Sequence, residues 1–323
     1  MAAANKRDTL FPGSSVLGKR DSSGSPRLSA SQLPPIPDFP PNKRRTPLPA
    51  PLPVKINPNS QSFSSNGRFQ RLEPSISLAP ICRMSNPWLR YHAILEEAQG
   101  DWVTIANAKE PKHPIVVIKR RACPSDDVRQ KIIGISHENI VALYEAYLYE
   151  GNLYFAYELM DVSLAEMQST PYGILAEFHI ATICKEVITG VQYIHRKLKI
   201  VHGSIDARWI MVSRSGCIKL ANIGESMSKD IPFAENERQD FQDLGLLMVR
   251  LMEAGTGHDG LELMKPEKWN NEIKRFLKKT QECSGEELEQ DVFLEQSPGS
   301  HCFKPLVLLT ERSIGRAWEY RMD

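Results

Sequence analysis

The sequence predicts an α+β fold with two lobes, a small β-rich lobe followed by a larger α-helical lobe, after a disordered N-terminal tail. Short β-branched runs are concentrated between residues 115 and 157, whereas segments with helical spacing of apolar residues come later. A region of strands that is followed by a region of helices is the pattern of an α+β domain. The tail is indicated by the uneven distribution of proline, because 14 of the 23 prolines fall in residues 1–85.

The tail, residues 1–87, combines few apolar residues with positive charge. Residues 1–85 contain 12 Lys and Arg against 4 Asp and Glu, whereas the rest of the chain contains 28 against 35. Such a segment cannot bury enough apolar surface to offset the entropy that is lost on ordering. We therefore expect a solvated basic tether joined to a mildly acidic body.

Three short patterns in the tail are candidate contact sites, although a tether without any decisive site is the simpler interpretation. The run Lys43–Arg45 fits a nuclear address or a contact with an acidic surface. The proline-rich stretches 33–37 and 47–51 favour polyproline II, the conformation that SH3- and WW-type domains bind. Ser25 and Thr46 each precede proline and fit proline-directed phosphorylation, which would weaken the neighbouring positive charge.

The cysteines and the apolar runs also indicate in which cellular compartment the protein is expected. The six cysteines are scattered, without a CxxC pair or a Cys/His cluster of zinc spacing, so we expect reduced thiols in the cytoplasm, the nucleus or both. No apolar run approaches the roughly 18 residues of a membrane span, and the N-terminus lacks the apolar stretch of a signal peptide. We expect no membrane partner and no nucleic-acid partner.

The body, residues 88–323, has predicted elements that can be placed in order. Strands are predicted at 115–118 and 152–157, a long amphipathic helix at about 175–196, strands at 210–212 and 217–220, and helices at about 239–253 and 268–280. The boundary between the lobes falls near residue 160, which gives an N-lobe of about 88–160 and a C-lobe of about 161–323.

Seven short segments of the body occur in the order of one family's sequence motifs. They are Val116–Lys119, His137–Val141, Tyr157–Met160, Val201–Ile205, Lys219–Gly224, Asp240–Gly245 and Pro266–Trp269. Together they resemble the eukaryotic protein kinases, from the nucleotide-anchoring strand through the hinge and catalytic loop to the late C-lobe. The wording is most similar to the Ste20/p21-activated branch. A single match would be weak, whereas seven in the right order predict the bilobal kinase fold.

The resemblance assigns roles to several residues of the N-lobe. Lys119 stands where the family has the lysine that contacts ATP, although an ion-pairing strand residue is the alternative. Glu158 and Met160 fall in the hinge, with Tyr157 in the gatekeeper place. The family's glutamate partner of the lysine would fall at Val128, or at Asp127 after a one-residue slip.

The phosphate-binding loop of the family requires glycines, because backbone amides must approach the phosphates without a side chain between them. In register with Val103, the three places hold Glu96, Ala98 and Asp101. None is glycine, and two carry negative charge toward the place of the phosphates. A shifted loop that uses Gly100 is the alternative.

The catalytic places are altered together. The resemblance puts Ser204 at the catalytic aspartate, and a hydroxyl cannot act as a base near pH 7. Asp206 replaces the lysine that contacts the γ-phosphate. Trp209 replaces a magnesium-binding asparagine, and its indole offers no oxygen ligand, whereas Mg²⁺ prefers hard oxygen ligands. Asn222 replaces the metal-binding aspartate, so the negative charge of that ligand is lost. A displaced base, Asp206 or Glu225, is the alternative, but solvated or locally hydrogen-bonded acids are the simpler interpretation.

The residues that support the fold of the family match this sequence better than its catalytic residues do. Asp240 is expected to hold the backbone of the catalytic loop, and Ile132, Leu143, Ile223 and His202 fit the family's hydrophobic column, with His202 as a packed core residue. The stretch from Gly224 to Asp240 is short and lacks the Ala-Pro-Glu ending. The glutamate of that ending and its arginine partner late in the C-lobe are both missing. Loss of both members of a buried ion pair destabilises a fold less than loss of one, because loss of one leaves an unpaired buried charge.

The sequence therefore favours a catalytically impaired kinase-like domain that acts as a protein-binding scaffold or allosteric regulator in signalling. The expected partners are proteins, an active kinase among them, with the tail as a second contact. No cofactor is required; ATP is an alternative ligand, and magnesium is not expected. The rival interpretations are a weak or atypical ATP-binding serine/threonine kinase and a nucleotide sensor that binds ATP without turnover.

Overall fold

The structure, a computed structural model, describes residues 79–98, 101–110, 115–125, 127–229, 231–254, 260–315 and 318–320. All of them belong to one unit, Phe69–Asp323. The predicted tail sites at Ser25, 33–37, Lys43–Arg45, Thr46 and 47–51 lie outside the described residues, as does Gly100. The alternative phosphate loop that uses Gly100 therefore stays a prediction.

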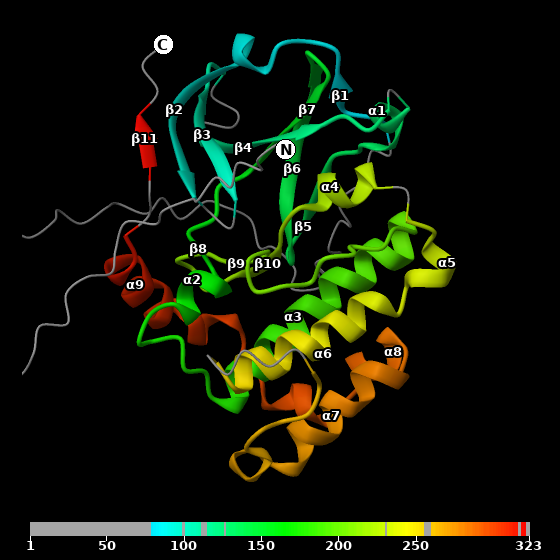
Figure 1. Cartoon of the computed structure of the whole chain (residues 1–323), viewed down its shortest axis with the longest axis vertical. Coiled ribbons are helices and arrows are strands. Elements are labelled where there is room, and N and C mark those ends of the chain that lie inside the picture. The colour runs from blue at the N-terminus through cyan, green and yellow to red at the C-terminus, as the bar shows by residue number, and fades with distance from the viewer. Residues whose placement is uncertain are drawn as a thin grey trace, which may run out of the picture. The chain divides into compact units, whose positions relative to one another are not determined.

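The first lobe is built on a twisted antiparallel sheet (Figure 1). Its strands are β2 (Tyr91–Ala98), β3 (Trp102–Ala108), β4 (Ile115–Ala122), β6 (Ile140–Tyr149) and β7 (Asn152–Glu158), in the order β2-β3-β4-β7-β6. Short strands β1 (Cys82–Arg83) and β5 (Ile135–His137) pair with β6. The sheet continues through β10 (Ile218–Leu220) to β9 (Ile210–Val212) and β8 (Val162–Ser163).

Alternation along β4 decides which side chains face the second lobe. Val117 packs in the cluster that also contains residues of the cleft, whereas Val116 and Ile118 pack in a separate cluster on the other face. Successive residues of a strand point to opposite faces. Lys119 therefore lies on the same face as Val117, toward the cleft, and Arg120 lies on the opposite face.

The second lobe packs helices around α3 (Glu177–Tyr193), whose Ile180, Ile183 and Val187 are almost fully buried. Helices α6 (Gln239–Met252) and α7 (Asn271–Glu282) share one core with it. The remaining helices are α2 (Leu164–Gln168), α5 (Phe233–Asn236), α8 (Gly285–Glu289) and α9 (Lys304–Ser313). The apolar residues that recur at helical spacing in α3, α6 and α7 therefore pack against one another in this core.

The predicted elements are confirmed with small shifts at their ends. Strand β9 has the predicted bounds, and α3 lies within the predicted helix, followed by one π-turn, Ile194–Leu198. Helix α7 begins at Asn271 and not at 268, because Pro266–Lys268 forms a separate 3₁₀ turn and the side chain of Asn270 caps the helix by accepting from the amide of Ile273, at 2.9 Å. Further 3₁₀ turns lie at Pro87–Leu89, Val292–Gln296 and Ser300–Phe303.

The folded body begins earlier than the predicted boundary at residue 88. Cys82 of β1 is buried and pairs with Ala146 of β6. The amide of Ile81 also donates to the carbonyl of Ile132, at 2.9 Å. Part of the segment 79–87, assigned from sequence to the tail, therefore packs against the sheet lobe through Ile81 and Cys82, which composition alone does not reveal.

Two short helices meet where the lobes join. Helix α1 (Val128–Lys131) is a single turn, and α4 (Ile223–Ser228) follows the metal-binding motif of the resemblance. The two are in contact: the amide of Ile133, just beyond α1, donates to Sδ of Met227 at 3.5 Å. Helix α4 also contacts β6 (Figure 1). No helix in the described part of the chain is long and apolar enough to cross a membrane.

Candidate functional site: a cleft filled by its own side chains

Lys119 of β4 lies at the centre of the cleft between the lobes and is only 5% exposed. Its ammonium donates a hydrogen bond of 2.5 Å to Oδ1 of Asn222 and lies 4.1 Å from the centre of the Trp209 ring. The attraction between a cation and an indole face adds to the hydrogen bond. Burial lowers the pKa of Lys119 from 10.5 to about 8, although the nearby carboxylate of Glu225 opposes the shift.

Glu225 of α4 supplies the carboxylate nearest to Lys119. Its Oε1 lies 3.7 Å from Nζ of Lys119 and 3.6 Å from a guanidinium nitrogen of Arg121. The side chain is buried, so these charges attract one another with little screening by water. The sequence offered Val128 or Asp127 for this role, but Val128 is apolar and buried and Asp127 is exposed. The acid comes instead from beyond Gly224.

Tyr157, in the gatekeeper place of β7, fixes Glu225. Its hydroxyl donates to Oε2 of Glu225 at 2.6 Å and accepts from the amide of Gly224 at 2.9 Å. A Cβ on Gly224 would lie 2.6 Å from both the Tyr157 hydroxyl and the ring of Phe155. Glycine is therefore required here because α4 approaches the sheet so closely. Burial beside this carboxylate raises the pKa of Tyr157, so the hydroxyl stays a donor.

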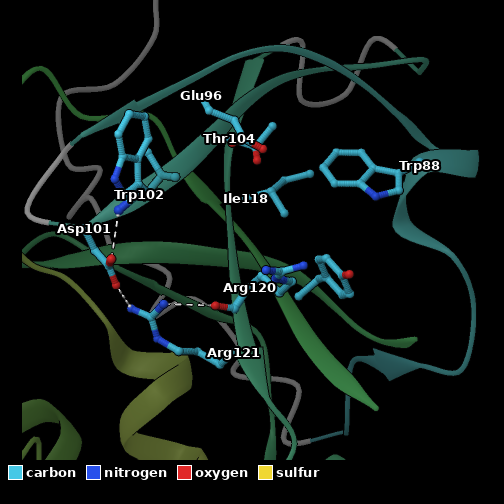
Figure 2. Close-up of a pocket in the computed structure, with 10 residues that line it drawn as sticks. Trp88, Glu96, Asp101, Trp102, Thr104, Ile118, Arg120 and Arg121 are labelled. Atoms are coloured by element: carbon cyan, nitrogen blue, oxygen red, sulfur yellow. Dashed lines mark hydrogen bonds and ion pairs between the residues drawn. The ribbon is translucent and has the colours of Figure 1, made fainter. Parts of the chain in front are cut away.

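A second acid, Asp101, closes the network at the tip of the β2–β3 hairpin. Its Oδ1 accepts from the amide of Trp102 at 2.8 Å, and its Oδ2 accepts from Arg121 at 2.5 Å (Figure 2). Arg121 thus lies between Asp101 and Glu225. The other two phosphate-loop places, Glu96 and Ala98, lie within β2 and pair with Thr104 and Trp102 of β3. At this place the family binds phosphates, whereas here a carboxylate is bound by an arginine of the same chain.

The remaining space below the hinge is small. The cavity lined by Lys119, Trp209, Tyr157 and Met160 has a volume of about 30 Å³. Sites for ligands of the size of a nucleotide have volumes of about 300–1,000 Å³. Trp209, in place of the family's small asparagine, fills part of this space with its indole. This cavity beside Lys119 therefore has room for little more than one water molecule.

The two hinge residues predicted from the sequence are engaged inside the protein. Both carboxylate oxygens of Glu158 accept from Lys219, at 2.8 and 2.6 Å, and Oε2 also accepts from the amide of Ala142 at 3.2 Å. Met160 is buried in the sheet-lobe core. The hinge is thus joined to β10 and β6 by the side chain of Glu158.

The catalytic loop brings no carboxylate toward Lys119. Ser204 is half-buried, and within the described residues its hydroxyl has no hydrogen-bond partner. Asp206 is bound elsewhere: Oδ1 accepts from the backbone and side chain of Arg208, both at 2.9 Å, and Oδ2 from Arg250 at 3.2 Å. Burial raises the pKa of Asp206, but the hydrogen bonds from Arg208 outweigh it and hold the pKa below its ordinary value. Asp206 is thus a locally bonded acid.

Asp240, at the start of α6, holds the course of this loop. Its Oδ2 accepts from the amide of His202 at 2.8 Å and from Nε2 of His195 at 2.7 Å, and its Oδ1 accepts from the amide of Gly203 at 2.7 Å. His202 is fully buried and its Nε2 donates to the carbonyl of Ala221 at 2.7 Å. Burial lowers the pKa of His202, so the imidazole is neutral.

Three residues that the resemblance assigns to a hydrophobic column pack together in the structure. Ile132, Leu143 and Ile223 are each at most 1% exposed and belong to one cluster. The carbonyl of His202 accepts from the hydroxyl of Ser226, at 2.9 Å, so the loop is also attached to α4. The column therefore joins the sheet lobe to the catalytic loop through α4.

The residues of this cleft do not fit ATP with magnesium. The lysine that would contact the phosphates is already bonded to Asn222 and Glu225, and Glu225 and Asp101 would repel phosphate oxygens. Among the described residues, no group of three or more His, Cys, Asp and Glu could hold a metal ion. A larger cavity of about 360 Å³ is lined by residues such as Trp88 and Arg120, and also by Asp101 and Arg121 at the tip of the hairpin; Lys119 is not among its lining residues (Figure 2).

The fold and the arrangement of these segments agree with comparisons with known proteins. The family model for the protein kinase domain matches residues 128–238. Serine/threonine-protein kinase MST20 of Pyricularia oryzae is 29% identical over 190 residues, 56% of this chain and 20% of the relative. Serine/threonine-protein kinase shk1/pak1 of Schizosaccharomyces pombe is 30% identical over 156 residues, 46% of this chain and 23% of the relative.

A third relative, the protein kinase domain-containing protein ppk2 of Schizosaccharomyces pombe, is 27% identical over 150 residues, 44% of this chain and 22% of the relative. The matched part of the chain thus spans less than a quarter of the length of each of these relatives. The similarity covers the hinge, the catalytic loop and the segment that contains α4. Over residues 128–238 the chain is therefore similar to the protein kinase domain, and the relatives named above support the Ste20 branch of that family.

Proposed function

We propose that this chain is a non-catalytic member of its family, a pseudokinase whose kinase fold binds other proteins in signalling. One observation supports this most: Lys119 is enclosed by Asn222, Glu225 and Trp209 of the same chain, in a cleft with a cavity of about 30 Å³. The side chains of the protein occupy the place where the family binds the nucleotide phosphates.

The chemistry of the loop supports the same proposal. Phosphoryl transfer depends on positioning the nucleotide and on neutralising its charge with metal ions and cations. Here a serine stands at the place of the base, and the acid nearest to it in sequence, Asp206, is bonded to Arg208 and Arg250. Loss of a general base alone lowers a rate by about 10²–10⁴-fold. The folded core is kept while these groups are lost, which fits a protein selected for binding.

A nucleotide titration of the purified full-length chain tests the proposal. ATP present at 100 times its dissociation constant would stabilise the chain by about 2.7 kcal/mol, roughly 5–10 °C in melting temperature. We expect a shift below about 1 °C at millimolar ATP, with and without Mg²⁺. We also expect no transfer of labelled phosphate to a general protein substrate.

The rival functions give different results in the same titration. A nucleotide sensor would show a saturable shift without phosphate transfer. A weak kinase would show transfer that is lost in Lys119→Ala and kept in Lys109→Ala, a matched variant that removes an exposed lysine outside the cleft. Either result would refute the proposal of a cleft closed to nucleotide.

The binding role needs a separate measurement. We propose an active kinase of the Ste20 type as one partner, since the relatives named above are kinases of that kind. Mixing the chain with such a kinase should give a complex in analytical ultracentrifugation and change the turnover of the kinase several-fold. A panel of such kinases that shows neither complex nor change in turnover would contradict this part of the proposal.

A further inference from the structure

The end of the described chain returns to the sheet lobe. Strand β11 (Trp318–Tyr320) pairs antiparallel with β2, with Trp318 opposite Glu97, Glu319 opposite Glu96 and Tyr320 opposite Leu95 (Figure 1). β2 is the strand on which the kinase resemblance places the phosphate loop. The backbone of a segment near the end of the described chain is therefore paired with the strand that holds two of the phosphate-loop places, Glu96 and Ala98.

The helix that precedes β11 is fixed to the other lobe. Val307 and Thr310 of α9 are fully buried, and α9 packs beside α2 and β8. Its Glu311 binds Nε of Arg214 at 2.8 and 3.1 Å. The backbone amide of Arg214 in turn donates to Asp161, just after the hinge, at 2.7 Å. Helix α9 is thus attached beside the hinge.

Few residues connect helix α9, fixed to the helical lobe, with strand β11, paired with the sheet lobe. Helix α9 ends at Ser313 and β11 begins at Trp318, so the chain crosses from one lobe to the other in five residue steps. Five residues span at most about 18 Å when fully extended. An opening of the lobes that moves β2 further than this from α9 must break the pairing of β11 with β2.

We propose that β11 is a clamp that holds the phosphate-loop strand to the helical lobe and keeps the cleft closed. The β2–β3 hairpin is then held at two points, by β11 along the edge of Leu95–Glu97 and by Arg121 at Asp101. The edge of β2 is in this sense a strand-binding site, whose ligand is an extended segment that pairs through its backbone. The clamp rests on the proposed closed state of the cleft and names what maintains it.

Removal of β11 tests the clamp directly. A chain that ends at Gly315 keeps α9 and loses β11, whereas a chain that ends at Tyr320 keeps β11 and serves as the matched control. Hydrogen–deuterium exchange of peptides that cover β2 should become at least tenfold faster in the first chain and stay unchanged in the second. A second variant, Glu319→Pro in the full-length chain, disrupts pairing because proline lacks the amide proton, and should reproduce the faster exchange.

The state of the cleft is measured in the same proteins by chemical labelling. Lys119 is buried, so an amine-reactive reagent should modify it slowly in the full-length chain. The chain that ends at Gly315 and the Glu319→Pro variant should show Lys119 modification several-fold faster, while exposed Lys109 is modified at an unchanged rate. Mass spectrometry of the digested protein resolves the two lysines.

Rescue in trans separates a binding site from a general loss of stability. A synthetic peptide of residues 314–323 should restore slow exchange in β2 of the shortened chain at about millimolar concentration, the effective concentration that a short tether supplies. A scrambled peptide should not. Unchanged exchange in β2 and unchanged labelling of Lys119 after removal of β11 would overturn the clamp. ATP binding by the full-length chain would overturn the proposed function and leave the exchange result for the clamp standing.

Discussion

The hydroxyl of Tyr157 lies 2.6 Å from Oε2 of Glu225, so a residue of the hinge strand holds the first acid of helix α4 inside the cleft. The same hydroxyl accepts from the amide of Gly224. One side chain therefore forms hydrogen bonds to one oxygen of a buried carboxylate and to a buried backbone donor. This relationship connects the gatekeeper place with the partner of Lys119, two features that are separate in the family.

Tyr157→Phe removes this hydroxyl and nothing else. The carboxylate of Glu225 and the amide of Gly224 each lose a partner in a buried place, which costs about 1–3 kcal/mol for an unsatisfied group. We expect the free energy of unfolding, measured by urea denaturation, to fall by about that amount. Tyr154→Phe, on the other face of the sheet, is the control and should change stability by less than about 0.5 kcal/mol. Equal effects of the two changes would contradict the role of the hydroxyl.

Gly224→Ala should be severe, because the added Cβ meets the Tyr157 hydroxyl and the Phe155 ring at 2.6 Å. Either α4 moves away from β7 or the rings shift, and overpacking of this kind costs about 1–3 kcal/mol. Differential scanning calorimetry measures the loss. Gly315→Ala is the matched control, since a Cβ there has no neighbour within 4 Å. Similar melting temperatures for both variants would show that α4 does not depend on this close approach.

Lys119 predicts a specific dependence of stability on pH. Its pKa is about 8 in the folded chain and near 10.5 when unfolded, so between these values the unfolded chain binds more protons and stability rises with pH. The destabilisation from the buried ammonium is fully present below pH 8 and is relieved as the pH rises toward 10.5. Between pH 7 and 9.5 we expect the wild type to gain about 2 kcal/mol relative to Lys119→Met. Urea denaturation of both proteins at each pH measures the difference, and a constant difference would contradict burial of a titrating lysine.

Asp240→Asn tests the support of the catalytic loop. The amide group keeps one acceptor oxygen, so at least one of the donors at His202, Gly203 and His195 loses its partner. We expect a loss of about 2–4 kcal/mol in unfolding free energy, since hydrogen bonds to charged groups are the stronger ones. Asp127→Asn, at an exposed position, should be neutral within about 0.5 kcal/mol. Faster hydrogen exchange at the amides of His202 and Gly203 should accompany the loss.

The fold could be predicted from the sequence because its signals are local and repeated. The strands at 115–118 and 152–157 and the long helix around 175–196 follow from side-chain periodicity, and the order of seven motifs then selects one family. The boundary of the body was placed too late, because β1 has two residues and its stability comes from pairing with β6. So short a strand leaves no periodic signal.

The interior of the cleft could be predicted only in part. The absence of carboxylates at Ser204 and Asn222 is visible in the sequence, whereas the direction of Glu225 is not. That direction depends on the close approach that Gly224 permits and on the hydroxyl of Tyr157, which lies far away in the sequence. A usable signal was present in the spacing of Ile223 and Met227, which suggests one helical turn and places Glu225 between them.

Asp240 contacts the main chain of the loop at His202 and Gly203 and leaves the side chain of residue 204 out of the arrangement. Any small residue at position 204 is therefore compatible with the same backbone path. Such an anchor fixes the backbone of the loop whether residue 204 carries a carboxylate or a hydroxyl. The path of the loop and the chemistry of its side chain are therefore set by different atoms, and either can change while the other persists.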